Sequence, residues 1–82
     1  MGVTIASLGN AAAPGFWLET PLVTQPAKGH VSYGAKGTSV AVDLIPIGGD
    51  AGSGSRISLA AMRVLGAPLT GLPELRVFQL TN

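Results

Sequence analysis

Residues 30–45 read His-Val-Ser-Tyr-Gly-Ala-Lys-Gly-Thr-Ser-Val-Ala-Val-Asp-Leu-Ile, and this stretch decides the class of the fold. Two runs in which polar and apolar side chains alternate flank a glycine-bounded turn at residues 34–37. Alternation with a period of two places successive side chains on opposite faces of a strand. The stretch therefore predicts a β-hairpin in which Val40, Val42 and Leu44 share one face of the second strand.

Glycines and prolines divide the rest of the chain into short segments, with 12 Gly and 6 Pro among 82 residues. Residues 15–24 are rich in aromatic and β-branched side chains and predict a strand, which Pro21 either confines to a sheet edge or breaks in two. Residues 48–55 are rich in glycine and predict a flexible loop. Residues 74–80 alternate between polar and apolar side chains and predict a closing strand.

One short helix is predicted at residues 59–65, because Ser58 before it is a good N-cap and Gly66 after it suits the C′ position. Pro68 follows shortly and cannot continue a helix. The apolar side chains of this segment share one face, which must pack on a sheet because so short a helix is unstable alone in water. These side chains are Leu59, Ala61, Met62 and Leu65.

The order of these segments predicts a mainly β fold, a small β-barrel with one short α-helix near residues 59–65. We expect a single barrel domain over residues 14–82. Residues 1–13 are small and apolar without a clear period. They predict either a first strand or an arm that becomes ordered on a partner.

Length and composition restrict how so small a domain gains stability. A domain of 82 residues buries only about 60–65% of the surface that its unfolded chain exposes. Cysteine is absent, which excludes disulfides and thiolate metal sites, and one histidine with four carboxylates offers few ligands for any other metal. We therefore expect no metal and no cofactor, and oligomerisation or docking remains as the source of further stability.

Charge is scarce in this chain. Only 11% of the residues are charged, against roughly 25% in an ordinary soluble domain, and the mean hydropathy is +0.45. Such a chain is expected to expose apolar patches, so its expected partners are copies of itself or other subunits of a large assembly. The net charge of +1 gives no electrostatic footprint for nucleic acid or an anionic membrane. No segment reaches the ~18 apolar residues of a spanning helix and nothing basic precedes Lys28, so we expect the protein in the cytoplasm or in a virion.

The second half of the chain carries a family resemblance. Residues 36–39 (Lys-Gly-Thr-Ser) turn into the valine-rich residues 40–42, and residues 56–58 (Arg-Ile-Ser) lead into a helix of small residues that ends at Gly66. In this order of elements, residues 28–80 resemble the double-psi β-barrel domain of the rare-lipoprotein-A-like proteins, which are relatives of barwin and expansin. The resemblance implies a double-psi topology for the barrel.

The resemblance also implies where the family's chemistry would lie. The two aspartates of the family, one of them expected to act as a general acid on a glycan bond, fall at Pro46 and Arg56 of this chain. Proline cannot exchange a proton and arginine is permanently charged, whereas glycoside cleavage needs a placed acid of tuned pKa. The resemblance therefore implies a barrel without the family's activity, and we assign no catalytic residue.

Several side chains are candidates for contact with a partner. Phe16 and Trp17 are adjacent, so a strand would direct one to the core and leave the other as an anchor. His30 begins the hairpin and could be a base, a ligand or a pH switch, but without a second histidine or a nearby carboxylate in sequence an interface role is favoured. A carboxylate pair of Glu19 and Asp43 would need two strands to bring them together. The candidate interface consists of Phe16, Trp17, Leu18, His30 and Tyr33.

Three functions are consistent with the sequence. We expect a non-enzymatic structural or assembly subunit of a multi-copy complex, specifically a phage-like head or tail component, by analogy with the composition of viral subunits. The alternative is a barrel module that binds peptidoglycan or another glycan without catalysis. The third is a small cell-wall-active enzyme that uses residues which the resemblance misplaces.

Overall fold

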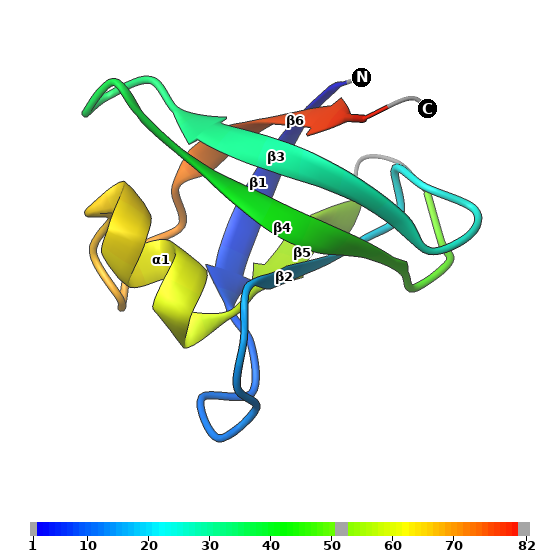
Figure 1. Ribbon diagram of the computed structural model, residues 1–82, viewed down its shortest axis with the longest axis horizontal. Coiled ribbons are helices and arrows are strands. Elements are labelled where there is room, and N and C mark those ends of the chain that lie inside the picture. The colour runs from blue at the N-terminus through cyan, green and yellow to red at the C-terminus, as the bar shows by residue number, and fades with distance from the viewer. Residues whose placement is uncertain (1, 51–52, 81–82) are drawn as a thin grey trace.

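The chain forms a closed six-stranded barrel with a short helix at one end, as a computed structural model of residues 2–50 and 53–80 shows (Figure 1). The expected mainly β class with a short helix is confirmed. The elements are β1 (Gly2–Leu8), β2 (Trp17–Thr20), β3 (Ala27–Tyr33), β4 (Thr38–Pro46), β5 (Ser55–Ile57), α1 (Leu59–Leu65) and β6 (Glu74–Gln79).

The strands follow the order β1-β5-β2-β4-β3-β6 around the barrel, and β6 pairs with β1 to close it. Two pairings are parallel, β1 with β5 and β2 with β4, and the other pairings are antiparallel. A closed barrel leaves no strand edge open for another chain to extend. A closed six-stranded barrel is not specific to the double-psi topology, which stays a prediction.

The predicted hairpin is confirmed as β3 and β4. Tyr33 pairs with Thr38, and the backbone N–H of Lys36 donates to the carbonyl of Tyr33 at 3.2 Å across the turn. Alternation along β4 buries Val42 and Leu44 inside the barrel, as the sequence pattern predicts.

The core fills the barrel and extends to α1, which packs against β4 (Figure 1). Each strand contributes inward side chains to this core, and α1 adds one apolar face, because a helix this short is held by packing rather than by propensity. The buried apolar side chains are Ala6, Leu18, Val23, Val31, Val42, Leu44, Ile57, Ala61, Met62, Leu65, Ala67, Leu75 and Val77.

The N-terminal segment is a strand of the barrel and not an arm. β1 lies between β5 and β6, with Ala6 opposite Ser55 and Thr4 opposite Leu75. The Thr4 and Ser55 hydroxyls share a buried hydrogen bond of 2.7 Å. Of the two alternatives for the N-terminal segment, the structure thus has the first strand, and the barrel includes residues 2–8.

The short strands β2 and β5 depart from the expectations. β2 ends at Thr20, and the Thr20 hydroxyl accepts the backbone N–H of Leu22 at 3.2 Å, so Pro21 ends a strand inside a closed barrel instead of lying at an edge. The expected loop ends earlier than residue 55, because Ser55 begins β5 and is buried. Residues 51–52 of that loop lie outside the described residues.

Ser58 joins α1 to β2. Its hydroxyl accepts the backbone N–H of Ala61 at 3.3 Å as the N-cap, and also that of Trp17 at 3.2 Å. Its own backbone N–H donates to the carbonyl of Trp17 at 3.0 Å. At the other helix end Gly66 has φ 77°, the left-handed conformation of a C′ glycine. Both predicted helix caps are thus confirmed.

Ser58→Ala is expected to lower the free energy of unfolding by about 1–3 kcal/mol, because it removes the cap and leaves the Trp17 N–H without its acceptor. Urea denaturation measures the loss. The control is Ser39→Ala at an exposed position of β4, which should change stability by less than about 0.5 kcal/mol. Equal effects of the two substitutions would contradict the assigned role.

Gly29 lies where β3 approaches β6 too closely for a side chain. A Cβ atom at this position would meet the backbone carbonyl oxygen of Phe78 and would lie 2.7 Å from Cδ1 of Leu44. Because the carbonyl belongs to a paired strand, it cannot move without disturbing the barrel.

Gly29→Ala is therefore expected to destabilise the fold by about 1–3 kcal/mol or to prevent folding. Gly34→Ala is the matched control, since a Cβ at Gly34 has nothing within 4 Å. Thermal unfolding followed by circular dichroism compares the two variants. A Gly29→Ala protein as stable as the Gly34→Ala protein would show that the barrel relaxes at this point.

Candidate functional site

Four exposed residues form a row across the outer face of the barrel, which we call the transverse row: Phe16, Asp43, Lys28 and Leu80. Asp43 on β4 is the register partner of Lys28 on β3 and of Trp17 on β2. Phe16 precedes Trp17, its carbonyl accepts the N–H of Asp43 at 3.0 Å, and its side chain lines a hollow with Asp43, Lys28 and Leu80. The N–H of Leu80 donates to the carbonyl of Lys28 at 2.8 Å. The row therefore crosses the sheet at right angles to β3 and β4.

The transverse row has an ion pair in its middle and an apolar side chain at each end. The Lys28 ammonium contacts the Asp43 carboxylate, and these side chains are 77% and 55% exposed. Phe16 is 45% exposed and Leu80 is 52% exposed. Across the face the chemistry thus reads apolar, acidic, basic, apolar.

Two shallow hollows adjoin the ion pair. One has a volume of about 380 Å³ and is lined by Phe16 and Leu80 as well as by Lys28, Asp43 and Ala41. The other has a volume of about 520 Å³, and its lining includes Pro26 and Ile45 together with the same two charged residues. The face is therefore uneven, and both hollows combine apolar walls with the same opposite charges.

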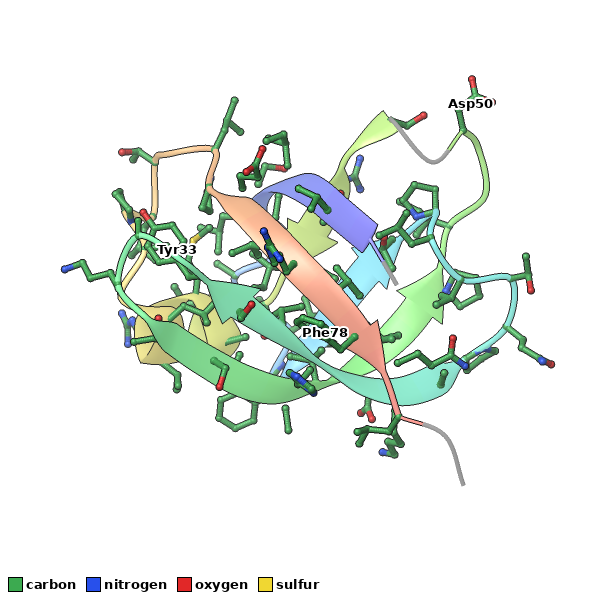
Figure 2. All side chains as sticks on the ribbon, turned by 90° about the horizontal axis from the view of Figure 1, so that it is seen from above. Tyr33, Asp50 and Phe78 are labelled. Carbon is green, nitrogen blue, oxygen red and sulfur yellow. The ribbon has the colours of Figure 1, made fainter. Side chains whose placement is uncertain are left out.

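A stacked pair of aromatic rings lies beside the transverse row. The rings of His30 and Phe78 have centroids 4.8 Å apart and planes inclined by 18°. His30 follows Lys28 by two positions on β3, so its side chain lies on the same outer face, and Ala41 is its register partner on β4. One face of the imidazole ring is covered by Phe78, whose place on β6 is labelled in Figure 2.

The structure brings two of the five predicted interface residues, Phe16 and His30, to this face. Tyr33 is half-buried against the core near the β3–β4 turn, apart from Phe78 (Figure 2). Trp17 is half-buried as well, and the chain approaches its ring at Gly9, where a Cβ would lie 2.6 Å from the ring atom Cη2.

The prediction that Leu18 belongs to the interface is wrong, because this side chain has no exposed surface and belongs to the core. Phe16 precedes β2, so the inward positions of this strand are Leu18 and Thr20 rather than Phe16 or Trp17. The partner contact expected at Leu18 would require the barrel to open.

Sequence reasoning missed Lys28 and Leu80 and gave Asp43 a different partner. Counting outward from the Tyr33–Thr38 pair of the hairpin reaches Lys28 opposite Asp43, so the register contained a signal for the ion pair. Asp43 contacts Lys28, whereas Glu19 lies opposite Ile45 and Arg56 in the sheet.

The two positions that the family resemblance marks for aspartates lie away from the transverse row. Pro46 ends β4 opposite Thr20, and Arg56 is exposed on β5. Arg56 borders a shallow hollow of about 360 Å³ with the apolar side chains of Ile5, Ile47 and Leu72. Within residues 2–50 and 53–80, no group of three or more His, Asp or Glu side chains could hold a metal ion.

Comparisons with protein-family models, curated proteins and solved structures found no match to this chain. Among the helices in the described part of the chain, none has the length and apolar character needed to cross a membrane.

The Lys28–Asp43 pair is expected to contribute little to folding, because exposed ion pairs are worth about 0–1 kcal/mol. Lys28→Ala and Asp43→Ala should each lower the free energy of unfolding by less than about 1 kcal/mol. A double-mutant cycle in urea measures the coupling between the two side chains. A coupling energy well above this range would make the pair a structural element of the barrel.

Proposed function

We propose that this protein is a non-enzymatic structural subunit that works packed against neighbours in a multi-copy assembly. The observation that carries the proposal is the number of large apolar side chains exposed over the outside of so small a barrel. They are Val3, Ile5, Phe16, Ile45, Ile47, Val64, Leu69, Leu72, Phe78 and Leu80.

These side chains are distributed over several elements. Val3 and Ile5 project from β1, Ile45 from β4, and Phe78 from β6, while Val64 lies on the outer face of α1. Single exposed apolar residues are ordinary, but many on a total surface of 4699 Å² leave little room for a polar coat. Burial of these side chains against neighbours supplies the stability that a small domain without disulfides lacks.

The closed barrel restricts how neighbours can attach. Because all six strands have partners on both sides, an added strand finds no edge to extend. Association must therefore use exposed side chains of the strands, the helix and the loops, which is where the apolar residues lie. This mode suits a rigid building unit that keeps its fold on assembly.

A phage-like head or tail component is the specific assembly within this proposal, and it rests on the short, weakly charged chain. The genes beside this one test it directly. Neighbouring virion genes would support the assignment, whereas neighbouring cell-wall genes would favour the glycan-binding alternative.

Self-association is expected to be measurable with the purified protein. Size-exclusion chromatography with light scattering, run from low to high micromolar concentration, should give a mass that rises above that of the 8.2 kDa chain. A protein that keeps the mass of one chain at every concentration would overturn the proposal.

A further inference from the structure

We propose that the transverse row is a self-complementary contact, through which two copies of this chain pair face to face about a two-fold axis. The inference rests on the proposed function and deepens it by naming the surface and the partner. The occupant of this face is a second copy of the chain.

The order of apolar and charged side chains along the transverse row suits a two-fold contact. Phe16, Asp43, Lys28 and Leu80 read apolar, acidic, basic, apolar across the sheet. Consider a two-fold axis that lies between the two facing copies, parallel to β3 and β4 and directly above the gap between these strands. This axis reverses the order of the row in the facing copy. Asp43 of each copy then faces Lys28 of the other, and Phe16 of each faces Leu80 of the other.

The charges explain why this pairing is specific. In one isolated copy the Lys28–Asp43 pair is solvated and weak. Between two copies each carboxylate lies near two ammonium groups, its own and that of the neighbour, and the surrounding apolar side chains exclude water. Complementary charges at a contact fix register and reject wrong pairings, while the apolar ends provide the burial.

The backbone of this face is suited to a rigid contact. β3 and β4 are long strands of 7 and 9 residues joined by a tight turn. The row crosses the half of this hairpin that is remote from the turn. On the same face Ala41 and His30, with Phe78 stacked on the imidazole ring, extend the contact beside the charges. The side chains of the row therefore project from paired backbone, apart from Phe16 and Leu80, which are held by hydrogen bonds to it.

The other exposed hollow does not have this property. Arg56 is the charged residue in the lining of this hollow, whose apolar walls come from Ile5, Ile47 and Leu72, while Glu19 lies opposite Arg56 on β2 and does not line it. A two-fold axis at this hollow would bring one arginine toward the other. Of the two surfaces, the transverse row is the one that complements itself.

The test uses charge reversal in the full chain. Lys28→Glu makes all four facing charges of a pair negative, and Asp43→Lys makes them all positive. Because like charges facing each other cost several kcal/mol, each variant alone should self-associate about a hundredfold more weakly or worse. An equimolar mixture of the two variants places opposite charges in every contact. The mixture should therefore associate at least as tightly as the unchanged protein.

Lys36→Glu and Asp50→Lys are the matched controls. They carry the same charge changes on an exposed turn and an exposed loop, and Asp50 is labelled in Figure 2 on a loop away from Phe78. Each control should associate like the unchanged protein, both alone and mixed. Circular dichroism confirms that all four variants are folded, and sedimentation velocity measures association.

The outcomes separate the two proposals. If the unchanged protein assembles but Lys28→Glu and Asp43→Lys do not weaken it, or their mixture does not restore association, the transverse row is rejected as the contact while the assembly function stands. If the unchanged protein is a single chain at every concentration, both proposals fail. The two-fold pairing is supported if Lys28→Glu and Asp43→Lys each weaken association, their mixture restores it, and the control variants show neither effect.

Discussion

Closure of the barrel by β1 is the constraint on which the rest of this structure depends. β1 pairs in parallel with β5 and in antiparallel with β6, so it joins two strands that would otherwise be the edges of an open sheet. The buried Thr4–Ser55 hydrogen bond, and the bond from the Ala6 N–H to the Pro73 carbonyl at 3.0 Å, hold this seam. Closure both encloses the core and leaves the six described strands without an open edge. Contact with another molecule by strand addition is therefore excluded for these strands, and exposed side chains of the strands, α1 and the loops remain available.

The transverse row depends on other pairings of the same barrel. Lys28 and Asp43 come from one hairpin, but Phe16 and Leu80 reach the row because β2 and β6 lie on its two sides. The apolar ends of the row thus depend on pairings between distant parts of the chain. Only the charged middle is a local feature. This division matters, because apolar ends supply burial while the charges supply register.

The same division separates what the sequence predicts from what it does not. The hairpin and α1 are predictable since alternation, the glycine turn, the Ser58 cap and Gly66 act within a few residues. β5 is missed because three residues after a glycine-rich loop carry no period, and its position is decided by β1 and β2. Phe16 is predictable as an interface residue because it is a large aromatic side chain. Leu80 is not, because its place beside Lys28 depends on the pairing of β3 with β6, which no local sequence pattern indicates. Leu18 was misplaced because the sequence left open which of Phe16 and Trp17 points to the core, whereas the strand buries Leu18 and Thr20.

Antiparallel pairing of β1 with β6 also has a kinetic consequence. Gly2 is the register partner of Val77, so the first strand and the last lie side by side although nearly the whole sequence separates them (Figure 1). A long loop must close before this pairing contributes any stability, and folding of such topologies is slow. A circular permutation that joins β6 to β1 by a short linker and opens the chain at residues 34–37 would turn this seam into a local hairpin. The same barrel would then form by a shorter route, at the cost of making the β3–β4 pairing the distant one.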